Sequence, residues 1–130
     1  METHRLPEWS FLATAVLLAV HEVDSGYWRE WDLFQIPGGA GLFVLMHVGI
    51  FFLLFWGYGQ VLTGTRAGIW MSFAVACGAL VAGLVHGTFL LLGRPEFRSS
   101  VSIGVLLAVT ASGVVLLGAS ISAARRRATA

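Results

Sequence analysis

Four long apolar stretches constrain the fold of this chain more than any other feature of its sequence. They cover residues 9–28, 40–62, 68–92 and 101–122, and each is close to the roughly 20 residues that an α-helix needs to cross a bilayer. The chain has 130 residues, of which 57% are hydrophobic and 12% are charged, and one small soluble core cannot bury so much apolar surface. The sequence therefore predicts an integral membrane protein with a single all-α domain, residues 1–130, of four transmembrane helices.

The connections between these stretches contain residues that break helices. They are Pro37-Gly38-Gly39, Gly64-Thr65-Arg66 and Gly93-Arg94-Pro95. Since the last two connections are short, we expect neighbouring helices to pack antiparallel in a bundle. Residues 29–36 alternate charged side chains with Trp31, Phe34 and Ile36, which indicates a short interfacial segment between the first two helices that could cover the bundle end.

The arginines predict how the chain lies in the membrane. All eight basic residues are arginines. Five fall at one end of the predicted bundle and three at the other: Arg5, Arg66 and Arg125 to Arg127 against Arg29, Arg94 and Arg98. The positive-inside rule then predicts a protein of the inner (plasma) membrane with both termini in the cytoplasm. No basic face suits a nucleic acid, and the single cysteine, Cys77, excludes an intrachain disulfide.

Ionisable side chains within the apolar stretches gather near one end. His21, Glu22 and Asp24 close the first stretch, His47 lies in the second and His86 in the third. At a rise of 1.5 Å per residue, the three histidines lie about 9–11 Å below the outer boundary, in one layer. A charged residue inside the hydrocarbon costs on the order of 2.5–3.5 kcal/mol. The layer therefore predicts a functional site near the extracytoplasmic face.

Three imidazoles and a carboxylate are a common ligand set for Zn²⁺ or Fe²⁺ between the helices of a bundle. Asp24 follows His21 by three residues and shares its helix face, whereas Glu22 lies about 100° away. We expect metal ligands at His21, Asp24, His47 and His86, and acid–base roles for Glu22, Asp24 and Glu30. The fourth helix offers only hydroxyl side chains and is expected to close the bundle without a ligand. In the simpler interpretation, each histidine bonds a neighbouring helix and the carboxylates face the headgroups.

A longer pattern includes these residues. His21-Glu22-Val23-Asp24 is followed by Glu30-Trp31, and Phe97-x-Ser99-x-x-Ser102 opens the fourth helix. With His47 and His86, the pattern resembles a family of small bacterial four-helix membrane proteins of unknown function, over most of the chain. The resemblance implies one functional unit of His21, Glu22, Asp24, Glu30, His47 and His86, and no activity. Members of that family often carry a histidine where this chain has Ala82, so a site needing two ligands from this helix is in doubt.

Several functions fit these observations. The first hypothesis is a metalloenzyme that acts on a lipid or isoprenoid, in which Glu22 or Glu30 moves protons. A metal-free variant would use the carboxylates as acid and base to isomerise or cyclise a lipid. A further alternative is b-type haem between His47 and His86. The last is an accessory subunit of a larger membrane complex or a homo-oligomer.

Overall fold

The computed structural model describes residues 6–129, which form five helices. These are α1 (Leu6–Tyr27), α2 (Glu30–Leu33), α3 (Gly39–Leu62), α4 (Arg66–Leu91) and α5 (Ser100–Ala128). All except α2 are long and apolar enough to cross a membrane, which confirms the four predicted helices. The largest difference is at the end of α5, which continues to Ala128, beyond the predicted end at residue 122. Alanine and arginine are strong helix formers, and arginines in the last turn interact favourably with the helix dipole.

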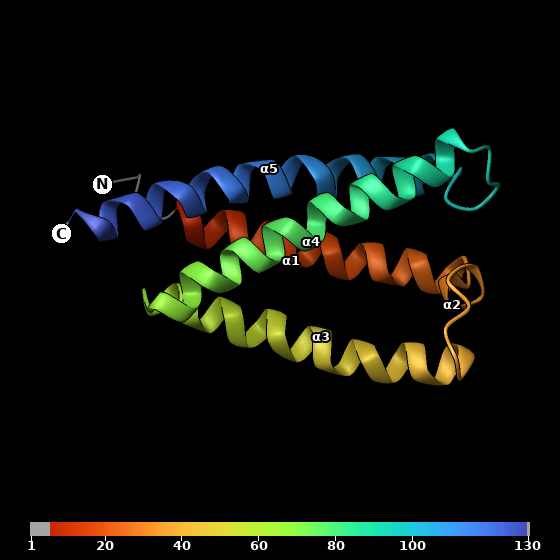
Figure 1. Cartoon of the computed structure of the whole chain (residues 1–130), viewed down its shortest axis with the longest axis horizontal. Coiled ribbons are helices and arrows are strands. Elements are labelled where there is room, and N and C mark those ends of the chain that lie inside the picture. Colours follow the sequence, from red (N-terminus) through yellow and green to blue (C-terminus); the bar gives the residue numbers. More distant parts are fainter. Residues whose placement is uncertain (1–5, 130) are drawn as a thin grey trace.

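Successive long helices run in opposite directions, so that α1 begins and α5 ends at the same end of the bundle (Figure 1). Helix α5 packs along α4 and α1, and α3 packs against α1 and α4. We call the end that carries the turn from α3 to α4 and residues 125–127 the arginine end. The opposite end, where α2 and the turn from α4 to α5 lie, is the histidine end.

All four long helices contribute to the core. One cluster of buried core residues combines Phe11 on α1, Leu54 on α3, Val75 and Ala76 on α4, and Leu116 on α5. Small residues bring α4 and α5 close together, because a Cβ added at Gly113 would lie 2.8 Å from the Cβ of Ala79 and one at Gly83 would collide with Thr110. The small residues near His86 on α4 thus serve helix packing, as in many membrane bundles.

The predicted interfacial segment is present as α2 and its flanking turns. Arg29 before α2 and Gln35 after it have left-handed backbone angles, with φ of 55° and 53°, which reverse the chain direction within a few residues. Trp31 packs against Phe43 of α3, with ring centroids 5.3 Å apart, and Phe34 packs against Phe89 of α4 at 5.6 Å. These contacts hold α2 across the histidine end and direct Glu30 towards the histidines.

Candidate functional site

His21 and His86 are in direct contact at the centre of the histidine end. The side chains come from α1 and α4, both residues are buried, and their ring centroids lie 4.6 Å apart with the rings nearly perpendicular. The Nδ1 atom of His86 lies 2.9 Å from the carbonyl oxygen of Ala82. A carbonyl only accepts hydrogen bonds, so Nδ1 of His86 carries a proton and Nε2 is the atom available to other partners.

Glu30 of α2 reaches this histidine pair. Its Oε1 atom lies 3.3 Å from Nε2 of His86, and its side chain is 12% exposed. Burial disfavours the charged carboxylate of Glu30, but the side chains of His86 and Ser25 outweigh burial and hold the pKa of this carboxyl below its ordinary value of 4.5. Glu30 is therefore an anion held against an imidazole at neutral pH.

Glu22 and His47 form a second pair on the other side of α1. Nε2 of His47 lies 2.7 Å from Oε2 of Glu22, and Nδ1 donates to the carbonyl oxygen of Phe43 at 2.6 Å. Since Nδ1 carries a proton, a further proton must lie between Nε2 and the carboxylate, because two lone pairs at this distance would repel. The Glu22–His47 pair therefore shares one transferable proton.

Asp24 is held by the fourth membrane helix. Its Oδ1 atom accepts a hydrogen bond of 2.9 Å from the hydroxyl of Ser102, which in turn accepts one of 3.1 Å from the indole Nε1 of Trp28. The hydroxyls of Ser99 and Ser102 are 2.7 Å apart. This network fixes the end of α1 to the start of α5. The expectation that the fourth membrane helix only closes the bundle therefore omitted a direct polar contact with the site.

Phe97 covers the histidine pair from the turn between α4 and α5. Its ring centroid lies 4.4 Å from that of His86 and 6.3 Å from that of His21, and the residue is 2% exposed. Its φ of 64° lies in the left-handed region, which is unfavourable for a bulky side chain. Such strain is common at functional sites. Phe97 and Ser102 were missed as individual site residues, although both lie in the motif that opens the fourth helix.

The structure separates the predicted metal ligands into three groups of contacting side chains. His21 and His86 lie together, His47 pairs with Glu22, and Asp24 turns towards Ser102. Within residues 6–129, no group of three or more His, Cys, Asp or Glu side chains is arranged to hold a metal ion. Among the described residues, the buried Nδ1 of His21 has no hydrogen-bond partner, and the buried Nε2 of His86 has only the 3.3 Å contact with Glu30, which does not meet hydrogen-bond geometry. The predicted acidic residues also separate, because Glu22 and Glu30 contact different histidines.

An apolar groove leads to the Glu22–His47 pair. Its cavity volume is about 300 Å³, and it lies between α3 and α4 with α1 at its base. Glu22 is the one charged residue among the described side chains that line it, and the remainder are apolar, including Leu18, Ile50, Leu53 and Met71. The groove therefore combines a surface for an alkyl chain with a carboxylate that shares a proton.

Comparison with known proteins gives a family and no activity. The model of a family described as "Family of unknown function (DUF6713)" matches residues 7–123, which include every residue of the two histidine–glutamate pairs. No curated protein and no solved structure matches the chain. What the site can do must therefore be argued from its own geometry.

Proposed function

The chain belongs to this family of unknown function, and from the contacts at the histidine end we propose that it binds a lipophilic small molecule and transfers a proton at that molecule's polar group. The observation that carries the proposal is the Glu22–His47 pair, with its 2.7 Å contact, beside the apolar groove between α3 and α4. A lipid or isoprenoid is the fitting class of ligand, because its chain would lie in the groove and its polar group would lie near Glu22.

The reaction that needs least from the protein is the movement of a proton from one carbon to another beside the polar group of the bound molecule. The pair would remove a proton at one position and return one at the next, so that atoms and charge balance without a further reactant. The hydrogen bond from Nδ1 of His47 to the carbonyl of Phe43 leaves Nε2 as the atom that gains and loses the proton. The apolar surroundings would keep bulk water out while the molecule is bound, so the proton that the pair delivers is one that it exchanged with water in the empty site.

Exchange of hydrogen with heavy water tests this proposal. The purified protein would be reconstituted in vesicles of a total lipid extract supplemented with farnesol and incubated in D₂O. The lipids would then be extracted, and their deuterium content would be measured by mass spectrometry. We expect deuterium to enter one lipid class with the wild type and to be lost with Glu22→Gln and with His47→Gln. Asp32→Asn is the matched control. Asp32 lies at the same end of the bundle, but its carboxylate is exposed and pairs with Arg29. Deuterium gain that is equal in all four proteins, or absent in all, would contradict the proposal.

A bound divalent cation is the second candidate. The buried Nδ1 of His21, which has no hydrogen-bond partner among the described residues, favours it, because the His21 ring contacts that of His86 and Nε2 of His86 lies 3.3 Å from Glu30. Zn²⁺ or Fe²⁺ there would require the side chains to rearrange so that both nitrogens and the carboxylate point to one position. Elemental analysis and an optical spectrum of wild type and His86→Ala distinguish the outcomes: metal that disappears in the variant supports the cation, and a Soret band would indicate haem.

We also propose the plasma membrane as the location, with both ends of the chain in the cytoplasm. The distribution of arginines supports this orientation, with Arg66 and Arg125 to Arg127 at one end; Arg5, which the sequence assigns to the same side, lies outside the described residues. The acid–base site would then lie near the extracytoplasmic surface, beneath α2. The family resemblance suggests a bacterial source.

A further inference from the structure

A cavity of the described chain lies at the arginine end, far from the histidines. It has a volume of about 500 Å³ and is bounded by the start of α1, the turn from α3 to α4 and the last turns of α5. Arg126 and Arg127 line it together with Thr65 and Glu8. The acid–base proposal gives this cavity no role, so its function is a separate question.

The cavity is positively charged. Arg126 also lines an adjoining groove of about 330 Å³ that continues along apolar residues of α5, including Val114 and Val115. Glu8 is the one acidic residue among the described lining, and no ion pair between described residues joins it to either arginine. Among the described residues, the lining therefore carries two guanidinium groups and one carboxylate, with no ion pair between them and a net positive charge.

One of these arginines is held in place by the backbone. Nη1 of Arg127 donates a hydrogen bond of 2.7 Å to the carbonyl oxygen of Gly64, in the turn from α3 to α4. A guanidinium has five N–H donors, so the others remain available to a ligand. An arginine fixed in this way loses less side-chain entropy when it binds an anion.

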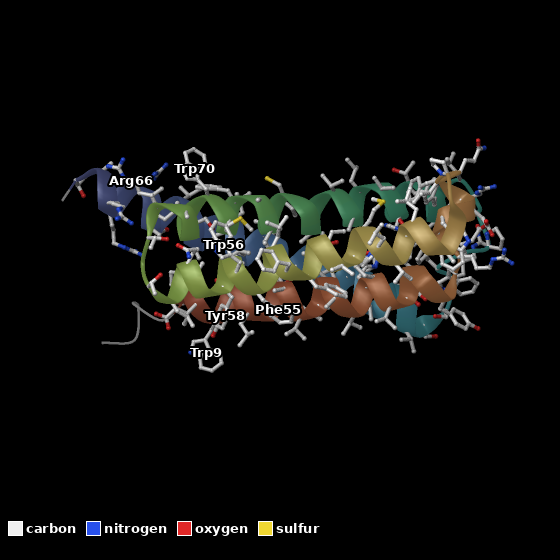
Figure 2. All side chains as sticks on the ribbon, turned by 90° about the horizontal axis from the view of Figure 1, so that it is seen from below. Trp9, Phe55, Trp56, Tyr58, Arg66 and Trp70 are labelled. Atoms are coloured by element: carbon white, nitrogen blue, oxygen red, sulfur yellow. The ribbon has the colours of Figure 1, made fainter. Side chains whose placement is uncertain are left out.

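Helix length and exposed aromatic residues indicate that the cavity would lie at the depth of the lipid headgroups. Helix α5 has 29 residues and is about 43 Å long at 1.5 Å per residue, which exceeds the roughly 30 Å of hydrocarbon. Trp9 and Trp70 are exposed at this end, where Figure 2 shows them with Tyr58 and Arg66. Tryptophan and tyrosine are typical of the interface between hydrocarbon and headgroups. In a bilayer, Arg126 and Arg127 would thus lie at the level of the lipid phosphates.

We propose that the cavity binds the headgroup of an anionic phospholipid, with its phosphate held by Arg126 and Arg127. The acyl chains would follow the adjoining apolar groove on α5. Guanidinium groups bind phosphate oxygens through paired, charge-assisted hydrogen bonds. A zwitterionic lipid fits less well, because its cationic amine would meet the same two arginines. This inference does not depend on the acid–base proposal.

Native mass spectrometry of the detergent-purified chain tests the site with phosphatidylglycerol and phosphatidylcholine as probes. The wild type should bind phosphatidylglycerol more tightly, and Arg126→Gln/Arg127→Gln should weaken that binding about tenfold to thirtyfold, at roughly 1 kcal/mol for each arginine. Arg125→Gln is the control for the loss of a neighbouring arginine charge, because it removes one positive charge from a residue that lines neither cavity. Its affinity for phosphatidylglycerol should change by less than about threefold.

Three outcomes would overturn the proposal: equal losses in Arg125→Gln and in the double variant, no preference for phosphatidylglycerol, or displacement of the lipid by millimolar inorganic phosphate. The last result would indicate a site for a free anion. Circular dichroism would verify that the variants fold. If the double variant does not fold, Arg126→Gln alone serves, since no described hydrogen bond joins the Arg126 side chain to the protein, and about a fivefold loss is expected.

Discussion

At the scale of single residues, two histidines on different helices are held in the same way. His47 and His86 each direct Nδ1 to the carbonyl four residues earlier and Nε2 to a glutamate. This arrangement fixes the tautomer and orientation of a histidine whose other nitrogen transfers a proton or binds a cation. The repetition on α3 and α4 favours a functional role for both pairs over two independent packing contacts.

Ser102 should be important for stability although it carries no charge. Ser102→Ala would leave Oδ1 of Asp24 and Nε1 of Trp28 without their partner, at a cost of about 1–3 kcal/mol. We expect a lower midpoint of thermal unfolding for the purified variant. Ser100→Ala is the control, because Ser100 is exposed on the same helix turn. Equal midpoints for the two variants would show that the network contributes little.

Glu30 predicts how stability changes in acid. The pKa of its carboxyl is held below the ordinary value of 4.5, so the folded chain binds this proton less tightly than the unfolded chain. The contribution of Glu30 to the free energy of unfolding is therefore present above pH 4.5 and is lost as the pH falls through the lower pKa of the folded state. The unfolding midpoint of the wild type should fall more steeply than that of Glu30→Gln between about pH 5 and pH 3. His21 and His86 are unchanged in both proteins, so parallel curves would contradict this assignment.

At the scale of helices, the sequence predicts which segments can cross a membrane better than it predicts which helices pack against each other. Length and composition specified all four membrane helices, because the bilayer requires about 20 apolar residues whatever the helices touch. The spacing of His21, Glu22 and Asp24 also predicted that Glu22 points away from His21. Spacing cannot tell which helix lies on each face of α1, however. The pairing of Asp24 with Ser102, of Glu22 with His47, and the position of Phe97 all depend on tertiary packing.

Glycines on α5 should differ sharply in how they tolerate a methyl group. A Cβ at Gly113 would lie 2.8 Å from that of Ala79 and 3.3 Å from the carbonyl oxygen of Ala76, whereas nothing lies within 4 Å of a Cβ at Gly118. Gly113→Ala should therefore push α4 and α5 apart and cost about 1–3 kcal/mol. Gly118→Ala should be neutral or stabilise the helix by about 0.5–1 kcal/mol. Thermal unfolding of both variants measures the difference, and equal effects would argue against tight packing of α4 on α5.

At the scale of the whole molecule, the bundle has two chemically different ends. The histidine end pairs imidazoles with carboxylates beneath α2, and the arginine end presents exposed guanidinium groups with Trp9 and Trp70. A chain with such polarity has one preferred orientation in a membrane, because moving the arginine end across the bilayer would require the transfer of Arg66 and Arg125 to Arg127. Proposals for either end therefore depend on which side of the membrane each faces.

Cysteine labelling tests this orientation. In a Cys77→Ala background, which removes the one native cysteine, Ser100→Cys would report on the histidine end and Thr129→Cys on the arginine end, since both positions are exposed. A charged, membrane-impermeant maleimide should label Ser100→Cys in intact cells and Thr129→Cys only after the cells are permeabilised. Labelling of both variants in detergent would show that each thiol is reactive. The reverse pattern in intact cells would place the histidine end in the cytoplasm, so that the acid–base site would exchange protons with the cell interior and the arginine cavity would face the outer leaflet.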